Sequence, residues 1–246
     1  MKYLLLMIVG AACVAKAEVA VTVGEVNDKR TTGEFFSGLE IKLLLAGPEL
    51  ADAKGVRVTV ESATDDTGKN LVDPKRGAFA DNFKPLKEPF GFGSNKKKGV
   101  YEIALALVNP LRAAKTVKLA GKVELMSPKA DPASIVTASV AKSAGKPLAD
   151  AALKAAGVAI TLKAPKGDDL AYDLKDPKKR VASVEFCATD GKALKVNGTS
   201  SWGGMGSSSV TVTIPNRPDE VMAKIYLITE KSLITVPLKM DAVELP

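Results

Sequence analysis

The stretches ESATDDTGKNLV (residues 61–72) and EFCATDGKALKV (residues 185–196) carry one pattern at two places in the chain. Each begins with Glu, passes through a polar turn to Gly-Lys, and returns to Leu. Because Gly68 and Gly191 can adopt a positive φ, the pattern predicts a β-hairpin in which Leu71 and Leu194 re-enter a core. A cation loop built from Asp65, Asp66 and Asn70 is the alternative, but a calcium loop ends in a bidentate acid and none follows here.

The similarity between the two regions extends beyond the hairpin. VTVESATDDTGKNLV aligns with ASVEFCATDGKALKV once two residues are inserted in the first turn. TVKLAGKVEL (116–125) aligns with TVPLKMDAVEL (235–245), and LEIKL (39–43) resembles VAITL (158–162). Three blocks in the same order predict two copies of one β-domain.

Alternating apolar and polar residues predict short strands throughout the chain, separated by turn sequences. The predicted strands are 19–23, 56–60, 101–107, 116–125, 158–162, 181–186, 209–214, 222–228 and 233–238. KPLADAALKAAG (146–157) predicts one helix, with Pro147 in its first turn and Gly157 at its end. The predicted fold class is all-β, with two tandem antiparallel immunoglobulin-like β-sandwiches at 18–127 and 157–246. A linker with the short helix, 128–156, joins them.

The N-terminus has the three parts of a secretory signal peptide at residues 1–17. Lys2 is followed by an apolar run from Leu4 to Val14 and by a small-x-small cleavage site ending at Ala17. The run is shorter than the roughly 20 residues that a membrane-spanning helix needs. We expect a periplasmic or secreted protein without a transmembrane span. A lipoprotein anchored at Cys13 is the less favoured alternative, because Gly10 replaces the large aliphatic residue of a lipobox.

Composition argues against several functions. The chain contains no His, which removes the commonest general base and the usual zinc ligand. Only six of the 35 basic residues are Arg, and acids are interspersed among them, so we predict no nucleic-acid partner. Cys187 is predicted to be a small buried hydrophobe. We predict no cofactor and no metal.

Two stretches predicted to be loops follow the two copies of the hairpin, and they contain four Phe residues and the only Trp. The stretch 73–99 is long enough to be functional or disordered, and 197–209 follows the second hairpin. The candidate binding residues are Phe79, Phe83, Phe90, Phe92 and Trp202. They predict a non-catalytic binding or structural module that presents loop ends to an extracytoplasmic protein or envelope polymer. The alternative for the rings is that they fold back and cap the sandwiches.

A hydrolase is the second functional class. Its candidate groups are carboxylates such as Asp65, Asp66 or Asp81, or a Ser-Lys pair formed by Ser143 and Lys146. The S-x-x-K match is weak, because no K-T-G or S-D-N sequence follows it in a helical domain. A concave pocket with convergent groups would favour catalysis, and a shallow surface around the aromatic residues would favour binding.

The repeated ATD-GKxL hairpin and the C-terminal TVPLxxxxVxLP strand give the chain a resemblance to a known group. It resembles exported bacterial proteins built of tandem immunoglobulin-like sandwiches, many of which have no assigned function. The resemblance covers most of the chain after residue 17. It implies a fold and not an activity, so it carries no functional residue with it.

The signal peptide gives a direct prediction about the exported product. Cleavage after Ala17 would make Glu18 the first residue, which N-terminal sequencing of the exported protein would show. A lipid attached to Cys13 would contradict this cleavage and support the lipoprotein alternative.

Overall fold

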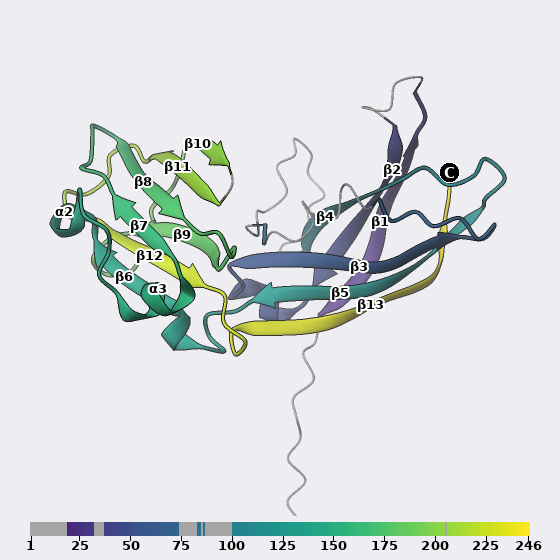
Figure 1. The fold of residues 1–246 in the computed structure, drawn as a ribbon, viewed down its shortest axis with the longest axis horizontal. Coiled ribbons are helices and arrows are strands. Elements are labelled where there is room, and N and C mark those ends of the chain that lie inside the picture. Colours follow the sequence, from purple (N-terminus) through teal and green to yellow (C-terminus); the bar gives the residue numbers. More distant parts are fainter. Residues whose placement is uncertain (1–18, 32–36, 74–82, 85, 87–99, 205) are drawn as a thin grey trace, which may run out of the picture.

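The computed structural model of the chain describes residues 19–31, 37–73, 83, 84, 86, 100–204 and 206–246. These residues are mostly β, and every pairing between strands is antiparallel. The fold therefore belongs to the all-β class, as the alternation predicted. The strands form two units that lie side by side in Figure 1.

The first unit consists of two three-stranded sheets around one hydrophobic core. One sheet has the order β1-β2-β4 and the other β13-β5-β3. The core-facing residues of β2 (Leu39, Ile41, Leu43 and Leu45) are buried, because alternate side chains of a strand point to one face. The strands are β1 (Ala20–Lys29), β2 (Gly38–Ala46), β3 (Gly55–Asp65), β4 (Val100–Leu107), β5 (Thr116–Met126) and β13 (Leu233–Glu244), with the 3-10 helix η2 (Pro48–Ala51) between β2 and β3.

The second unit pairs a four-stranded sheet, β10-β11-β8-β7, with a three-stranded sheet, β6-β12-β9. A separate core lies between them, and Ile160, Leu162, Leu170 and Ile225 are fully buried in it. The elements are η3 (Pro132–Ser134), β6 (Ile135–Ser139), α2 (Val140–Ser143), α3 (Ala151–Ala156), β7 (Ala159–Leu162), β8 (Asp169–Lys175), β9 (Val181–Cys187), β10 (Gly198–Gly204), β11 (Ser207–Thr213) and β12 (Met222–Leu227).

The C-terminal strand does not lie in the predicted second sandwich. β13 pairs with β5 from Leu233 opposite Met126 to Glu244 opposite Thr116. The two segments that were aligned as repeats, 116–125 and 235–245, are therefore neighbours in one sheet, and Val236 lies opposite Val123. The assignment of 233–246 to the second domain was wrong. The similarity of the segments reflects two strands that bury alternate residues in the same core.

The segment 128–156 is not a linker either. It contributes the strand β6 to a sheet of the second unit, and Val136, Val140 and Leu153 are buried in that unit's core. The predicted helix is shorter than expected, because the Asp150 side chain accepts hydrogen bonds from the backbone N–H groups of Ala152 and Leu153 and caps it there. Pro147 instead forms a β-bridge with Thr161. Gly157, at φ 72°, ends the helix as predicted.

The repeated hairpin is confirmed at both places. In the first copy the N–H of Gly68 donates to the carbonyl of Asp65 (3.0 Å), and that of Leu71 donates to Ala63 (2.8 Å). In the second, Gly191 donates to Ala188 (2.9 Å) and Leu194 donates to Phe186 (2.8 Å). The two glycines have φ of 91° and 85°. The hydrogen bonds have the same spacing in both copies, so the two hairpins align on Gly68 and Gly191 without the two-residue insertion that the sequence alignment used.

The two units share a common order of strands. β3, β5 and β13 in the first unit occupy the places of β9, β12 and β6 in the second. β1, β2 and β4 similarly match β7, β8 and β11, while β10 is an additional edge strand. β2 is thus central and β7 is an edge strand, so the predicted match between 39–43 and 158–162 was also wrong.

The position of β13 can be tested with a core variant. Leu238 is buried in the first core, and Leu238→Ala should cost about 2–5 kcal/mol of stability. Native-state hydrogen exchange should show faster exchange of amides in β1–β5, with little change in β7–β12.

The matched control is Leu162→Ala, which removes the same atoms from the second core. It should give faster exchange of amides in β7–β12, with little change in β1–β5. Faster exchange confined to β7–β12 in Leu238→Ala would contradict the observed pairing.

Candidate functional site

Of the aromatic candidates, Phe83 lies between the two units. Its ring packs in a small cluster with Met126 from β5 and Tyr226 from β12, and the guanidinium carbon of Arg57 lies 4.7 Å from its ring centre. Phe83 is therefore a half-buried packing residue at the junction of the two units. Phe79, Phe90 and Phe92 lie outside the described residues.

A polar group borders this junction. Lys54 of the first unit forms an ion pair with Glu185 of the second, with Nζ 2.8 Å from Oε1. The hydroxyl of Tyr226 donates to Glu185 Oε2 at 2.9 Å, and burial together with this carboxylate raises the pKa of Tyr226. The sequence analysis did not predict this contact, because Lys54 and Glu185 are far apart along the chain and the repeated hairpin that begins at Glu185 does not indicate which residue pairs with it.

Trp202 lies in a strand and not in a loop. β10 (Gly198–Gly204) and β11 (Ser207–Thr213) form a hairpin across most of the predicted loop 197–209. The Trp202 side chain is 85% exposed, the highest value among the exposed large hydrophobic residues of the described chain. The prediction that Trp202 sits at a loop end was therefore wrong, although its exposure fits a binding role.

One glycine keeps the two strands of this hairpin close together, and a second connects the hairpin to the rest of the unit. A Cβ on Gly203 would lie 2.3 Å from the carbonyl oxygen of Ser207, so the strands approach too closely there for a side chain. Gly206 has a φ of 81°, and its carbonyl accepts a hydrogen bond of 2.7 Å from the N–H of Asp176. Trp202 is thus held on an element anchored to the body of the unit.

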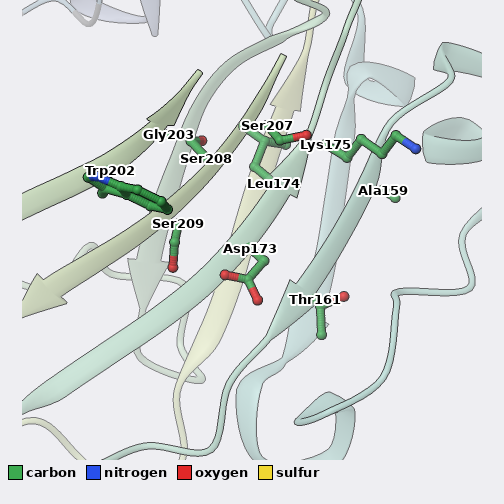
Figure 2. Close-up of a pocket in the computed structure, with 10 residues that line it drawn as sticks. All are labelled: Ala159, Thr161, Asp173, Leu174, Lys175, Trp202, Gly203, Ser207, Ser208 and Ser209. Atoms are coloured by element: carbon green, nitrogen blue, oxygen red, sulfur yellow. The ribbon is translucent and has the colours of Figure 1, made fainter. Parts of the chain in front are cut away.

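A row of polar side chains leads from Trp202 across the four-stranded sheet. Trp202 pairs with Ser209, Ser209 pairs with Asp173, and Asp173 pairs with Thr161. Figure 2 shows these four residues in sequence from β10 to β7. They line an open cavity of about 400 Å³. The face therefore combines one exposed aromatic ring with hydroxyl groups and a carboxylate.

The carboxylate that lines this cavity, Asp173, is paired with Lys163, and Lys175 is a second charged residue of the lining. Lys163 Nζ lies 2.7 Å from Asp173 Oδ1 and donates to Ser209 Oγ at 3.1 Å. The hydrogen bonds from Lys163 and then from Ser209 lower the pKa of Asp173. An ionised carboxylate that is paired in this way serves as a hydrogen-bond acceptor and not as a proton donor at neutral pH.

The carboxylates proposed for a hydrolase or a cation loop are used within the fold. Asp65 is buried and accepts hydrogen bonds from the N–H groups of Thr67, Lys69 and Leu111 and from the Thr67 hydroxyl. Asp66 accepts from the N–H of Lys115, and Asn70 Oδ1 accepts from Val72. Within the described ranges, no group of three or more acidic or Cys side chains could hold a metal ion.

The Ser143 and Lys146 pair does not form a recognisable catalytic arrangement. The N–H of Lys146 donates to the backbone carbonyl of Ser143 at 3.5 Å, and the Lys146 side chain is exposed. An exposed ammonium lacks the desolvated pocket in which a lysine acts as a base. Asp81, the remaining candidate, lies outside the described residues.

Cys187 is buried, as predicted, and burial raises the pKa of its thiol.

None of the helices in the described part of the chain is long and apolar enough to cross a membrane. Comparisons of the chain with protein-family models, curated proteins and solved structures gave no significant match.

Asp65 gives a stability prediction for the repeated turn. Burial alone would raise its pKa, but the hydrogen bonds to its carboxylate lower the pKa to about 2. Asp65→Ala removes the acceptor of the part-buried N–H groups of Thr67, Lys69 and Leu111 and should cost about 2 kcal/mol in denaturant unfolding.

The pH dependence follows from the lowered pKa. The stabilisation is fully present above the usual Asp value of 3.8 and is lost as the pH falls toward about 2. The stability difference between wild type and Asp65→Ala should therefore shrink over that interval. Asp190→Ala is the control, because Asp190 is an exposed residue of the second turn. An equal loss in both variants would contradict a special role for Asp65.

Proposed function

We propose that the protein is an exported, non-catalytic binding or structural module in which each unit is an immunoglobulin-like β-sandwich. Its contact surface is the β10 side of the second unit, centred on Trp202. Its partner is an extracytoplasmic protein or an envelope polymer. The signal peptide predicted at residues 1–17 supports export to the periplasm or the exterior.

The exposure of Trp202 carries the proposal. Burial of apolar surface contributes roughly 25 cal/mol per Å², and a Trp side chain offers about 150–250 Å². The Trp202 side chain is 85% exposed, so a partner that buried it would gain several kcal/mol of binding free energy. Trp is also enriched among the residues that dominate binding energy at protein interfaces.

The surroundings of Trp202 support binding over catalysis. Ser209, Asp173 and Thr161 offer hydrogen-bonding groups beside the ring, and the cavity is open. The carboxylate of Asp173, which lines the cavity, forms an ion pair with Lys163. No observation on the described residues favours the hydrolase alternative, so we do not propose it.

A pull-down from the native envelope tests the proposal. Trp202→Ala should reduce the amount of the captured partner by about tenfold or more, because interface Trp residues commonly contribute more than 1 kcal/mol each. The matched control is Leu111→Ala, since Leu111 is an exposed apolar residue of the first unit at 48% exposure. It should leave capture unchanged.

A second variant, shortened across 79–98, separates this surface from the other aromatic stretch. Capture that is lost only in the shortened variant would move the contact surface to 73–99. Capture that neither change alters would contradict the proposal as a whole.

A further inference from the structure

The outer edge of β10 is open to another strand. β10 is the last strand of its sheet, and all seven of its residues pair with β11 on one side. Along an antiparallel strand, backbone N–H and C=O groups point alternately to the two sides. Within the described part of the chain no strand lies beyond β10, so about half of its backbone groups face outward. Such an edge can pair with another chain.

β10 also lacks the features that normally protect an edge strand. It has no charged residue, no proline and no register shift, and six of its seven residues are exposed. The other edge strands are either short or carry at least one of these features. They are β1 with Glu25 and a register shift, β3 with Arg57, β4 with Glu102, β9 with Glu185, β13 with Pro237, and the short strands β6 and β7.

The sequence of β10 is complementary to itself. Two antiparallel copies related by a two-fold axis through Ser201 would pair each larger residue with a smaller one. Thr199 would face Gly203, and Trp202 would face Ser200. The full set of pairs is Gly198 with Gly204, Thr199 with Gly203, Ser200 with Trp202, and Ser201 with Ser201. A two-fold interface of this kind needs only one sequence.

This register would also cover the exposed ring. The two Trp202 residues would lie on one face as diagonal neighbours, about 7–8 Å apart at the backbone, within reach of aromatic side chains. Each ring could then pack on the other and on Ser200 opposite it. The exposure of Trp202 in the single chain would be removed by its symmetry mate.

The lack of charged side chains on the hairpin allows the β10 edges of two copies to approach each other. The chain has a formal net charge of +7, so two copies repel each other in general. The hairpin from Gly198 to Thr213 contains no charged residue, so its own side chains add no charge repulsion at this edge. We propose that β10 pairs with β10 of a second copy, joining two four-stranded sheets into one continuous sheet. This deepens the proposed function, since it rests on the same Trp202 surface and names its partner.

Sedimentation equilibrium of the purified protein tests the pairing. The mass should rise from one chain to two with increasing concentration. Trp202 is the only Trp, so its fluorescence maximum should shift to shorter wavelength over the same range. Ser201→Lys would place two ammonium groups at the two-fold axis and should weaken the dimer by at least about tenfold. Ser201→Glu should weaken it similarly.

A mixture of these two variants provides the decisive measurement. Lys from one copy and Glu from the other would meet at the axis, so the mixture should regain a dimer that neither variant forms alone. Thr235→Lys is the matched control, because it adds the same charge at an exposed position of another edge strand, β13. It should leave the dimer unchanged.

The outcomes separate this inference from the proposed function. A single-chain mass and a constant Trp emission at every concentration would overturn the pairing. A dimer that both Ser201 variants retain would overturn it as well. If the protein is monomeric while Trp202→Ala still abolishes capture of an envelope component, the pairing fails and the binding function stands.

Discussion

The pairing of β13 with β5 is the constraint on which the rest of the structure depends. β5 is bonded on both sides, to β3 and to β13, along almost its whole length. At its centre, Gly121 lies so close to β3 that a Cβ there would be 2.1 Å from the carbonyl oxygen of Thr59. Val236, Leu238 and Val243 of β13 complete the first core. The first unit is therefore completed by β13, a strand that follows all elements of the second unit in the sequence.

This arrangement joins the units by an exchange of strands. The strand that follows β5 is β6, which pairs with β12 in the second unit, and the strand that follows β12 is β13, which pairs with β5 in the first. The two crossing segments are hydrogen-bonded to each other, from the N–H of Ser127 to the carbonyl of Ser232 at 2.7 Å. With two crossings, the cluster around Tyr226 and the Lys54–Glu185 ion pair, the junction holds the units together at several points. Neither unit can be removed by one cut in the chain.

The sequence predicted both turns and many of the strands because local chemistry decides them, but it did not predict β2, β6, β8 or β10. Gly68 and Gly191 fix two turns through their positive φ, and alternation marks the face that each strand buries. Alternation does not say which strand lies alongside, so 235–245 could be matched to 116–125 as a repeat when the two are in fact paired. β10 was missed because Gly and Ser have low strand propensity, and pairing with β11 overrides that preference. The Lys54–Glu185 contact depends on tertiary structure alone.

Two properties distinguish the hairpin of β10 and β11: it has no charged residue, and it exposes Trp202. Charged residues make up 26% of the chain, yet the segment from Gly198 to Thr213 has none. A hairpin that only needed to stay in solvent would gain solubility from charge, and an edge strand would gain protection from it. The absence of charge, the exposed Trp202 and the glycines that hold the strands close all act on one edge of one sheet. The contact proposed for this edge would account for all three features, because the sheet behind β10 fixes the position of the ring.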